Sequence, residues 1–148
     1  GIIRSHYVGR TFIQPTDATR KLGVQLKHNA NSAVVKNRDI ILIDDSIVRG
    51  TTLKNIVALI KNAGAKSVHI RISSPPTVGS CFYGIDTPDK DKLLAVRMAQ
   101  DDMRIFLGAD SLEFISINGL YRAVCGQDKN EKTSQYCDAC FTSFYPVD

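Results

Sequence analysis

The sequence lacks any apolar run that approaches the roughly 18 residues of a membrane-spanning helix, and it does not open with a secretory signal. It also has no low-complexity tract. Its basic residues are scattered, and a net charge of +4 is modest, which favours an anionic ligand only weakly and does not suggest a nucleic-acid-binding surface. These absences predict a cytoplasmic globular protein with neither a membrane nor a nucleic acid as partner.

Cysteine is also scarce, because four residues are too few for a disulfide scaffold in a chain of 148 residues. Two of them, Cys137 and Cys140, form a C-x-x-C motif near the end of the chain. On spacing alone this motif fits a zinc half-site, a redox pair, a cluster half-site or two surface thiols. No second C-x-x-C or His pair completes a zinc site, and no thioredoxin-like context surrounds the motif.

The length suits one ordinary domain, which would bury about 68–70% of the surface of its unfolded chain. The first residue is Gly1, and the residues after it read as mid-sequence. We therefore expect this chain to be a piece of a longer polypeptide.

A strand–helix–strand unit is predicted in the first half of the chain. The continuous apolar run 39–44 is typical of a strand buried on both faces, and a helix with apolar residues at helical spacing follows over 51–62. Gly64 occupies a C-cap position, and 67–73 alternates like a strand. A βαβ unit of this length implies a parallel sheet with a right-handed crossover.

The remaining segments carry weaker signals. We predict a loop over 1–15, helical character over 16–26, a connector over 75–80, short helices over 90–98 and 101–108, a strand over 112–116 and a helix over 116–126. The sequence thus predicts one α/β domain.

The stretch "DDSIVRGTT" follows the first strand of this unit, where ligands of parallel sheets bind. Asp44 and Asp45 can accept hydrogen bonds from sugar hydroxyls or meet a divalent cation. Residues 46–52 supply amides, hydroxyls and a glycine at a helix N-terminus, which suits a phosphate. A phosphorylated ribose has both features. Each feature taken singly favours a simple turn and a helix cap over a ligand site.

The whole string resembles the phosphoribosylpyrophosphate (PRPP) signature of type I phosphoribosyltransferases. Further stretches are similar to the glutamine PRPP amidotransferase family over almost the entire chain, namely "YVGRTFIQP", "AGAKSVHIRISSPP", "CFYGIDTP", "LGADSLEF" and "CDACFTSFYP". The resemblance implies an α/β, parallel-sheet type I phosphoribosyltransferase (Rossmann-like) fold that is incomplete at its N-terminal side and has a helical C-terminal extension. It divides the chain into a phosphoribosyltransferase domain, 1–126, and a tail with the C-x-x-C motif, 127–148.

The resemblance also implies a function. Members of this family transfer ammonia to C1 of PRPP, giving 5-phosphoribosylamine and pyrophosphate in the first step of purine biosynthesis. The ammonia comes from glutamine in an N-terminal glutaminase domain, of which this sequence shows no trace. We expect the intact protein to be a homo-oligomer, and this chain alone not to use glutamine.

Site residues follow from the same resemblance. Asp44 and Asp45 are expected to bind the ribose hydroxyls and Mg²⁺. Phosphate contacts are expected from Ser46, Ile47, Val48, Arg49, Gly50, Thr51 and Thr52. Roles at the pyrophosphate, in the closing loop or along the ammonia passage are expected for Arg4, Tyr7, Arg10 and Lys27. Some relatives carry Lys where Arg4 stands, which changes the donor geometry.

Some members of the family bind a 4Fe–4S cluster, and Cys81, Cys137 and Cys140 match three of its ligands. The fourth ligand is expected upstream of residue 1, and Cys125 matches no ligand position. The resemblance therefore favours the cluster half-site over the other interpretations of the C-x-x-C motif.

Two alternatives to the transferase remain open. A PRPP-sensing regulator would bind PRPP without turnover, but such proteins usually append a nucleic-acid-binding element, and no such pattern is present. A salvage enzyme would need a segment that binds the ring of a purine or pyrimidine, whereas the region after residue 80 resembles the amidotransferases.

Overall fold

The computed structural model describes residues 2–4, 28–130 and 136–145. The chain forms two compact units built from interleaved segments. Among the described residues, the first unit comprises 2–4, 28–42, 50–69 and 104–111, and the second comprises 43–49, 70–103, 112–130 and 136–145.

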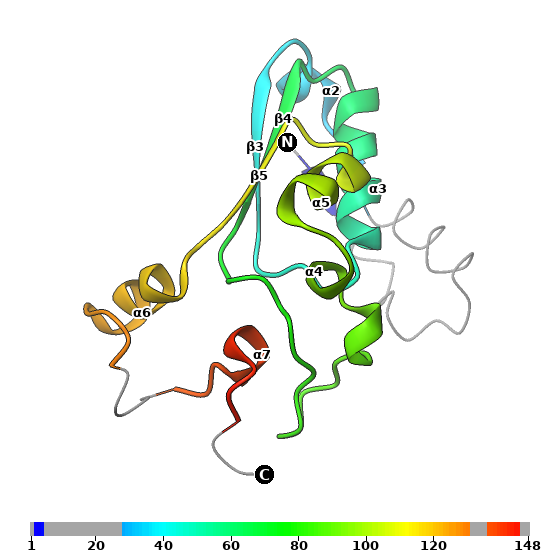
Figure 1. Cartoon of the computed structure of the whole chain (residues 1–148). Helices are drawn as coiled ribbons and strands as arrows, with labels where there is room; N and C mark the ends of the chain where they lie inside the picture. Colours follow the sequence, from blue (N-terminus) through cyan, green and yellow to red (C-terminus); the bar gives the residue numbers. More distant parts are fainter. Residues whose placement is uncertain (1, 5–27, 131–135, 146–148) are drawn as a thin grey trace. The chain divides into compact units, whose positions relative to one another are not determined.

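A three-stranded sheet has the order β3–β4–β5, formed by Asp39–Asp44, Ser67–Ile72 and Ser111–Phe114 (Figure 1). Backbone hydrogen bonds at the ends of the strands advance in the same direction along each neighbouring pair, from Lys66–Arg38 to Ser73–Asp44 and from Asp110–Val68 to Ile115–Ile72. The strands are therefore parallel, as the strand–helix–strand pattern predicts.

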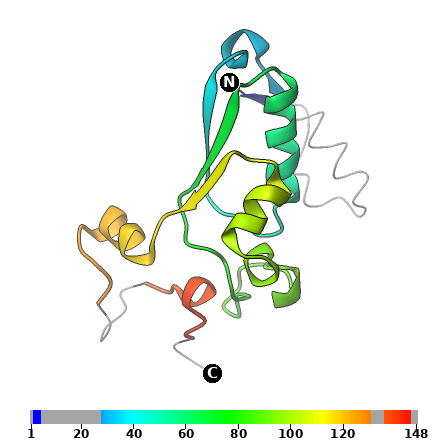
Figure 2. The same ribbon diagram turned by 45° about the horizontal axis from the view of Figure 1, so that its top comes forward.

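In the first unit, helix α3 (Thr51–Asn62) runs alongside the adjoining parts of β3 and β4 (Figures 1 and 2). Its buried residues are Leu53, Val57 and Ile60, which lie on one face of a helix. Gly64 follows the C-cap residue and has a φ of +94°, a left-handed conformation that favours glycine. The predicted helix and its glycine stop are confirmed.

The first unit also contains a short antiparallel pair, β1 (Ile2–Arg4) with β2 (His28–Ala30), followed by helix α2 (Ser32–Val35). The prediction of a loop throughout 1–15 is therefore wrong for residues 2–4. A strand of this length shows no periodicity of its own, and its partner lies far away in the sequence. The helical character predicted over 16–26 lies outside the described residues.

Strand β3 corrects a second prediction. Its residues alternate between exposed and half-buried, and the side chains of Ile41 and Ile43 are 67% and 72% exposed. The apolar run was interpreted as a strand buried on both faces, but in the described part of the chain one face of β3 is open to solvent.

The second unit contains a 3₁₀ turn, η2 (Lys90–Lys92), and the helices α4 (Leu94–Arg97), α6 (Ile117–Cys125) and α7 (Ala139–Thr142). Helix α5 (Gln100–Leu107) belongs partly to each unit. Helix α6 starts at the Ser116 cap and ends at Gly126, with a φ of +77°, as predicted, whereas α7 was not predicted. No helix in the described ranges has the length and apolar character needed to cross a membrane.

Candidate phosphate and sugar site

The two acids lie at the carboxyl end of β3, within the second unit. Asp44 is the last residue of the strand, and its Oδ1 accepts a hydrogen bond from the Asp45 amide at 3.1 Å. Asp45 Oδ1 accepts one from Ser46 Oγ at 2.8 Å. Burial raises the pKa of Asp44, and the charge of Asp45 raises it further, although the hydrogen bond from the Asp45 amide lowers it. A carboxylate in this position gains from a hydroxyl donor or a cation.

The segment after these acids, 45–49, is fixed from two neighbouring segments. The Asp44 carbonyl accepts hydrogen bonds from the Ser73 amide at 3.0 Å and from Ser73 Oγ at 3.2 Å. The Val48 carbonyl accepts one from the Leu94 amide at 2.8 Å. Between them the Ile47 side chain is only 3% exposed. This segment is therefore anchored near both of its ends by backbone hydrogen bonds.

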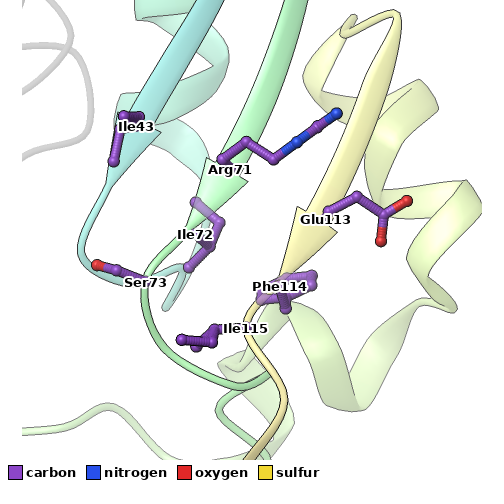
Figure 3. Close-up of a pocket in the computed structure, with 7 residues that line it drawn as sticks. All are labelled: Ile43, Arg71, Ile72, Ser73, Glu113, Phe114 and Ile115. Atoms are coloured by element: carbon purple, nitrogen blue, oxygen red, sulfur yellow. The ribbon is translucent and has the colours of Figure 1, made fainter. Parts of the chain in front are cut away.

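A surface hollow of about 300 Å³ lies at the carboxyl ends of all three strands (Figure 3). Seven residues line it, namely Ile43, Arg71, Ile72, Ser73, Glu113, Phe114 and Ile115. Ser73 links the hollow to Asp44. Sequence reasoning missed these residues, although the rule that ligands bind beyond the carboxyl ends of parallel strands applies to β4 and β5 as well.

The start of α3 belongs to the first unit. Gly50 is the N-cap residue, with a φ of +74°, and no side chain caps the helix there. Its carbonyl accepts the first helical hydrogen bond, from the Lys54 amide at 2.9 Å. The next residues, Thr51 and Thr52, are exposed in the first turn, where backbone amides lack helical acceptors. This end of α3 can accept an anion.

The structure does not describe the side chains of the residues that are predicted to act at the pyrophosphate. Tyr7, Arg10 and Lys27 lie outside the described residues, and for Arg4 only the backbone, at the end of β1, is described. Their roles remain predictions.

The three predicted cluster cysteines come from two segments of the second unit that are hydrogen-bonded to each other. The amides of Val78 and Gly79 donate to the Cys140 carbonyl at 2.8 and 2.9 Å. Burial raises the pKa of the Cys140 thiol, and the nearby Cys137 and Cys81 raise it further. The thiols are thus close enough to influence one another, and soft sulfur donors suit iron.

Within the described ranges, however, no group of three or more His, Cys, Asp or Glu side chains has an arrangement that could hold a metal ion. The cluster and the Mg²⁺ site therefore remain proposals.

Asp138, between the two cysteines of the C-x-x-C motif, is buried and is the N-cap residue of α7. Its carboxylate accepts hydrogen bonds from Tyr121 Oη at 3.0 Å and Thr142 Oγ1 at 3.2 Å, and it forms an ion pair with Lys129. Burial alone would raise the pKa of Asp138, but the bonds from Lys129 and Tyr121 outweigh it and lower the pKa. This network ties α6 to the C-x-x-C segment.

Two apolar residues that follow Cys81 are exposed, Phe82 by 74% and Ile85 by 69%. Phe82 lies against Tyr145, with ring centroids 4.9 Å apart. Cys125, which matches no cluster ligand, donates a hydrogen bond to the Tyr121 carbonyl within α6.

Comparison with known proteins supports the resemblance seen in the sequence. Residues 3–78 match the family model of the phosphoribosyl transferase domain. The amidophosphoribosyltransferase of Rhizobium etli is 57% identical over 99% of this chain and 30% of its own length. That of Bacillus subtilis is 45% identical over 100% of the chain and 31% of its own length.

A solved structure of the Bacillus subtilis glutamine PRPP amidotransferase, complexed with ADP and GMP, matches 99% of this chain and 32% of that protein, with a TM-score of 0.82 and 44% identity. The predicted α/β type I fold is thereby confirmed. The chain spans about a third or less of the curated relatives it matches. By its sequence match and its parallel sheet, this chain belongs to the phosphoribosyl transferase domain family.

Proposed function

We propose that this chain is the PRPP-binding part of an amidophosphoribosyltransferase, and that the complete polypeptide makes 5-phosphoribosylamine from PRPP and ammonia. One observation carries the proposal. A paired-acid stretch ends a parallel strand and leads through a braced loop to an uncapped helix start, in a chain 45–57% identical to proteins of that name.

In this proposal Asp44 and Asp45 accept hydrogen bonds from the ribose 2′- and 3′-hydroxyls and contact the Mg²⁺ that accompanies PRPP. The partly buried carboxylate of Asp44 has a raised pKa, so neutralising contacts stabilise its charged form. Residues 46–52 bind the 5′-phosphate through amides and hydroxyls. Positive charge on Arg49 adds to this attraction.

The proposed reaction needs no covalent intermediate with the protein. The nitrogen lone pair of ammonia forms a bond to ribose C1, and the bond from C1 to the pyrophosphate oxygen breaks with its electron pair on pyrophosphate. The nitrogen then loses a proton to solvent. The positive charges of Arg4, Arg10 and Lys27 would stabilise the leaving group, and Tyr7 would act at the pyrophosphate or along the ammonia passage. Water must be excluded, because it would hydrolyse PRPP.

Several features of the complete protein belong to the same proposal. Ammonia would come from glutamine in a separate glutaminase domain, the protein would be a cytoplasmic homo-oligomer, and the chain would divide after residue 126. Cys81, Cys137 and Cys140 would hold a 4Fe–4S cluster together with a fourth cysteine outside this chain. Such a cluster would be structural or oxygen-sensing.

The test is pyrophosphate release by the complete polypeptide, given Mg–PRPP and ammonium, with Asp44→Asn as the comparison. We expect ammonium-dependent release that the substitution abolishes. PRPP binding without release would instead support a PRPP-sensing regulator. Release that depends on an added purine or pyrimidine would support a salvage enzyme.

A further inference from the structure

The start of helix α4 contacts the predicted phosphate loop through a single backbone hydrogen bond. The Leu94 amide donates to the Val48 carbonyl at 2.8 Å, across 46 positions of sequence in the second unit. Leu94 is the first residue of α4, so its amide has no acceptor within the helix. This donor is therefore available to hold another segment.

The bond fixes the orientation of one peptide group in the loop. The described residues contain no cis peptide bond, so the 48–49 peptide is planar and trans. Its Arg49 N–H then points opposite to the Val48 carbonyl, away from α4. A rotation of this peptide by half a turn would present the carbonyl oxygen on the side where the amide now lies. An oxygen there would repel a phosphate, whereas the amide attracts it.

The contact is anchored on both sides by buried apolar residues. In the loop, Ile47 is 3% exposed, and at the start of the helix Leu93 and Leu94 are 0% and 1% exposed. Movement of either segment would expose these side chains to water. The bond therefore joins two fixed pieces of backbone.

The turn before α4 also places charge near the loop. Asp89, the N-cap residue of η2, forms an exposed ion pair with Lys92. The main cause that lowers the pKa of Asp89 is the hydrogen bond from Lys92, and the positive charge of Arg49 lowers it further. The same segment that holds the Val48 carbonyl therefore also lies within electrostatic reach of the Arg49 side chain.

We propose that Leu94 is a positioning residue for the phosphate loop, and that its backbone amide holds the Val48–Arg49 peptide in the orientation that receives the 5′-phosphate of PRPP. This inference rests on the proposed function. Leu94 touches no substrate in this account. Its effect is on the affinity for PRPP, because without the bond part of the binding energy is spent on ordering the loop.

The test separates the Leu94 amide from its side chain. In the complete polypeptide, Leu94 is replaced by leucic acid, which changes the amide to an ester and keeps the side chain. Leu94→Pro also removes the N–H. Its backbone angles fit a position that begins a helix after an extended residue, Leu93 (φ −73°, ψ 129°), but its ring takes the place of the N–H and crowds the Val48 carbonyl. Leu94→Ala is the matched control, since it removes the side chain and keeps the N–H.

The measurement is the equilibrium dissociation constant for Mg–PRPP, together with the KM and kcat for ammonium-dependent release. For the ester variant we expect the dissociation constant and KM to rise by roughly 3- to 10-fold, the range for one net hydrogen bond, with kcat at saturation little changed. The Pro variant should lose at least as much affinity. The Ala variant should be less stable, but it should lose less affinity than the ester variant because it keeps the N–H.

Equal affinities in the ester variant and the unaltered protein would overturn the positioning role while leaving the proposed function intact. So would an Ala variant that loses affinity as much as the ester variant does, since the side chain would then carry the effect. Failure of the unaltered protein to bind Mg–PRPP would overturn the proposed function and the positioning role together.

Discussion

The buried ion pair between Asp138 and Lys129 gives a stability prediction that can be worked from the structure. The two side chains are 7% and 20% exposed, and the carboxylate also accepts hydrogen bonds from Tyr121 and Thr142. Removing one partner of a buried pair costs about 3–5 kcal/mol, since the other charge stays buried. The partial exposure of Lys129 lets its ammonium regain water. We therefore expect a cost just below that range, about 2–3 kcal/mol, for Asp138→Asn.

The assay is urea denaturation of the chain, with Lys129→Met and the double variant completing a double-mutant cycle. We expect each single substitution to cost about 2–3 kcal/mol in the free energy of unfolding, and the double variant to cost no more than either alone. The coupling energy is then at least about 2 kcal/mol. A coupling energy below about 0.5 kcal/mol is typical of an exposed ion pair, so it would refute the claim that burial strengthens this pair.

The same pair predicts a pH dependence. The pKa of Asp138 is lowered in the folded protein, so its stabilising contribution is present above the unfolded pKa of about 3.9 and is lost as the pH falls through the folded pKa. The unfolding free energies of the unaltered chain and of Asp138→Asn should therefore converge in acid. A constant difference down to the acid limit would contradict this.

Three further predictions follow from the geometry. The pKa of Asp44 is raised in the folded protein, so its negative charge lowers the stability at neutral pH but not below about pH 3.9. Asp44→Asn should therefore raise the urea midpoint of unfolding at pH 7, although PRPP turnover is lost. In Gly79→Ala the new Cβ would lie 2.5 Å from Tyr145 Oη, so a loss of about 1–3 kcal/mol is expected on thermal unfolding, and an unchanged Tm would contradict it. The hydrogen bond from the Val68 amide in β4 lowers the pKa of Asp110, and the ion pair with Lys61, at 3.1 Å, lowers it further. Asp110→Asn should therefore lower the free energy of unfolding by less than about 1 kcal/mol above pH 4, and by nothing in stronger acid. Urea titrations across pH can check this.

Local patterns in the sequence predicted the centre of the fold well. The apolar spacing in α3, the glycine after it and the Ser116 and Gly126 ends of α6 are short-range signals that tertiary contacts did not override. What could not be predicted depends on distant partners. The β1–β2 pairing joins residues on either side of a long segment, and whether β3 is covered on one face or two is decided by what packs on it.

The candidate site divides in the same way. The acids and the loop were found because strand, acids, glycine and helix occur in one register of the sequence. The contacts of Ser73 and Leu94 were not found, since they lie 29 and 46 positions from the carbonyls they bind. Both are backbone amide donors, and no side-chain type in the sequence marks a backbone contact.

The most direct test of the account is equilibrium binding of Mg–PRPP to the complete polypeptide, with ribose 5-phosphate as competitor, in the unaltered protein and in Asp44→Asn. We expect the unaltered protein to bind PRPP, ribose 5-phosphate to compete for the same site, and the substitution to weaken PRPP binding by tenfold or more, since a bond to a charged group contributes about 1.5–3 kcal/mol. Unchanged PRPP affinity in Asp44→Asn would contradict the central claim that the stretch 44–52 binds the sugar phosphate.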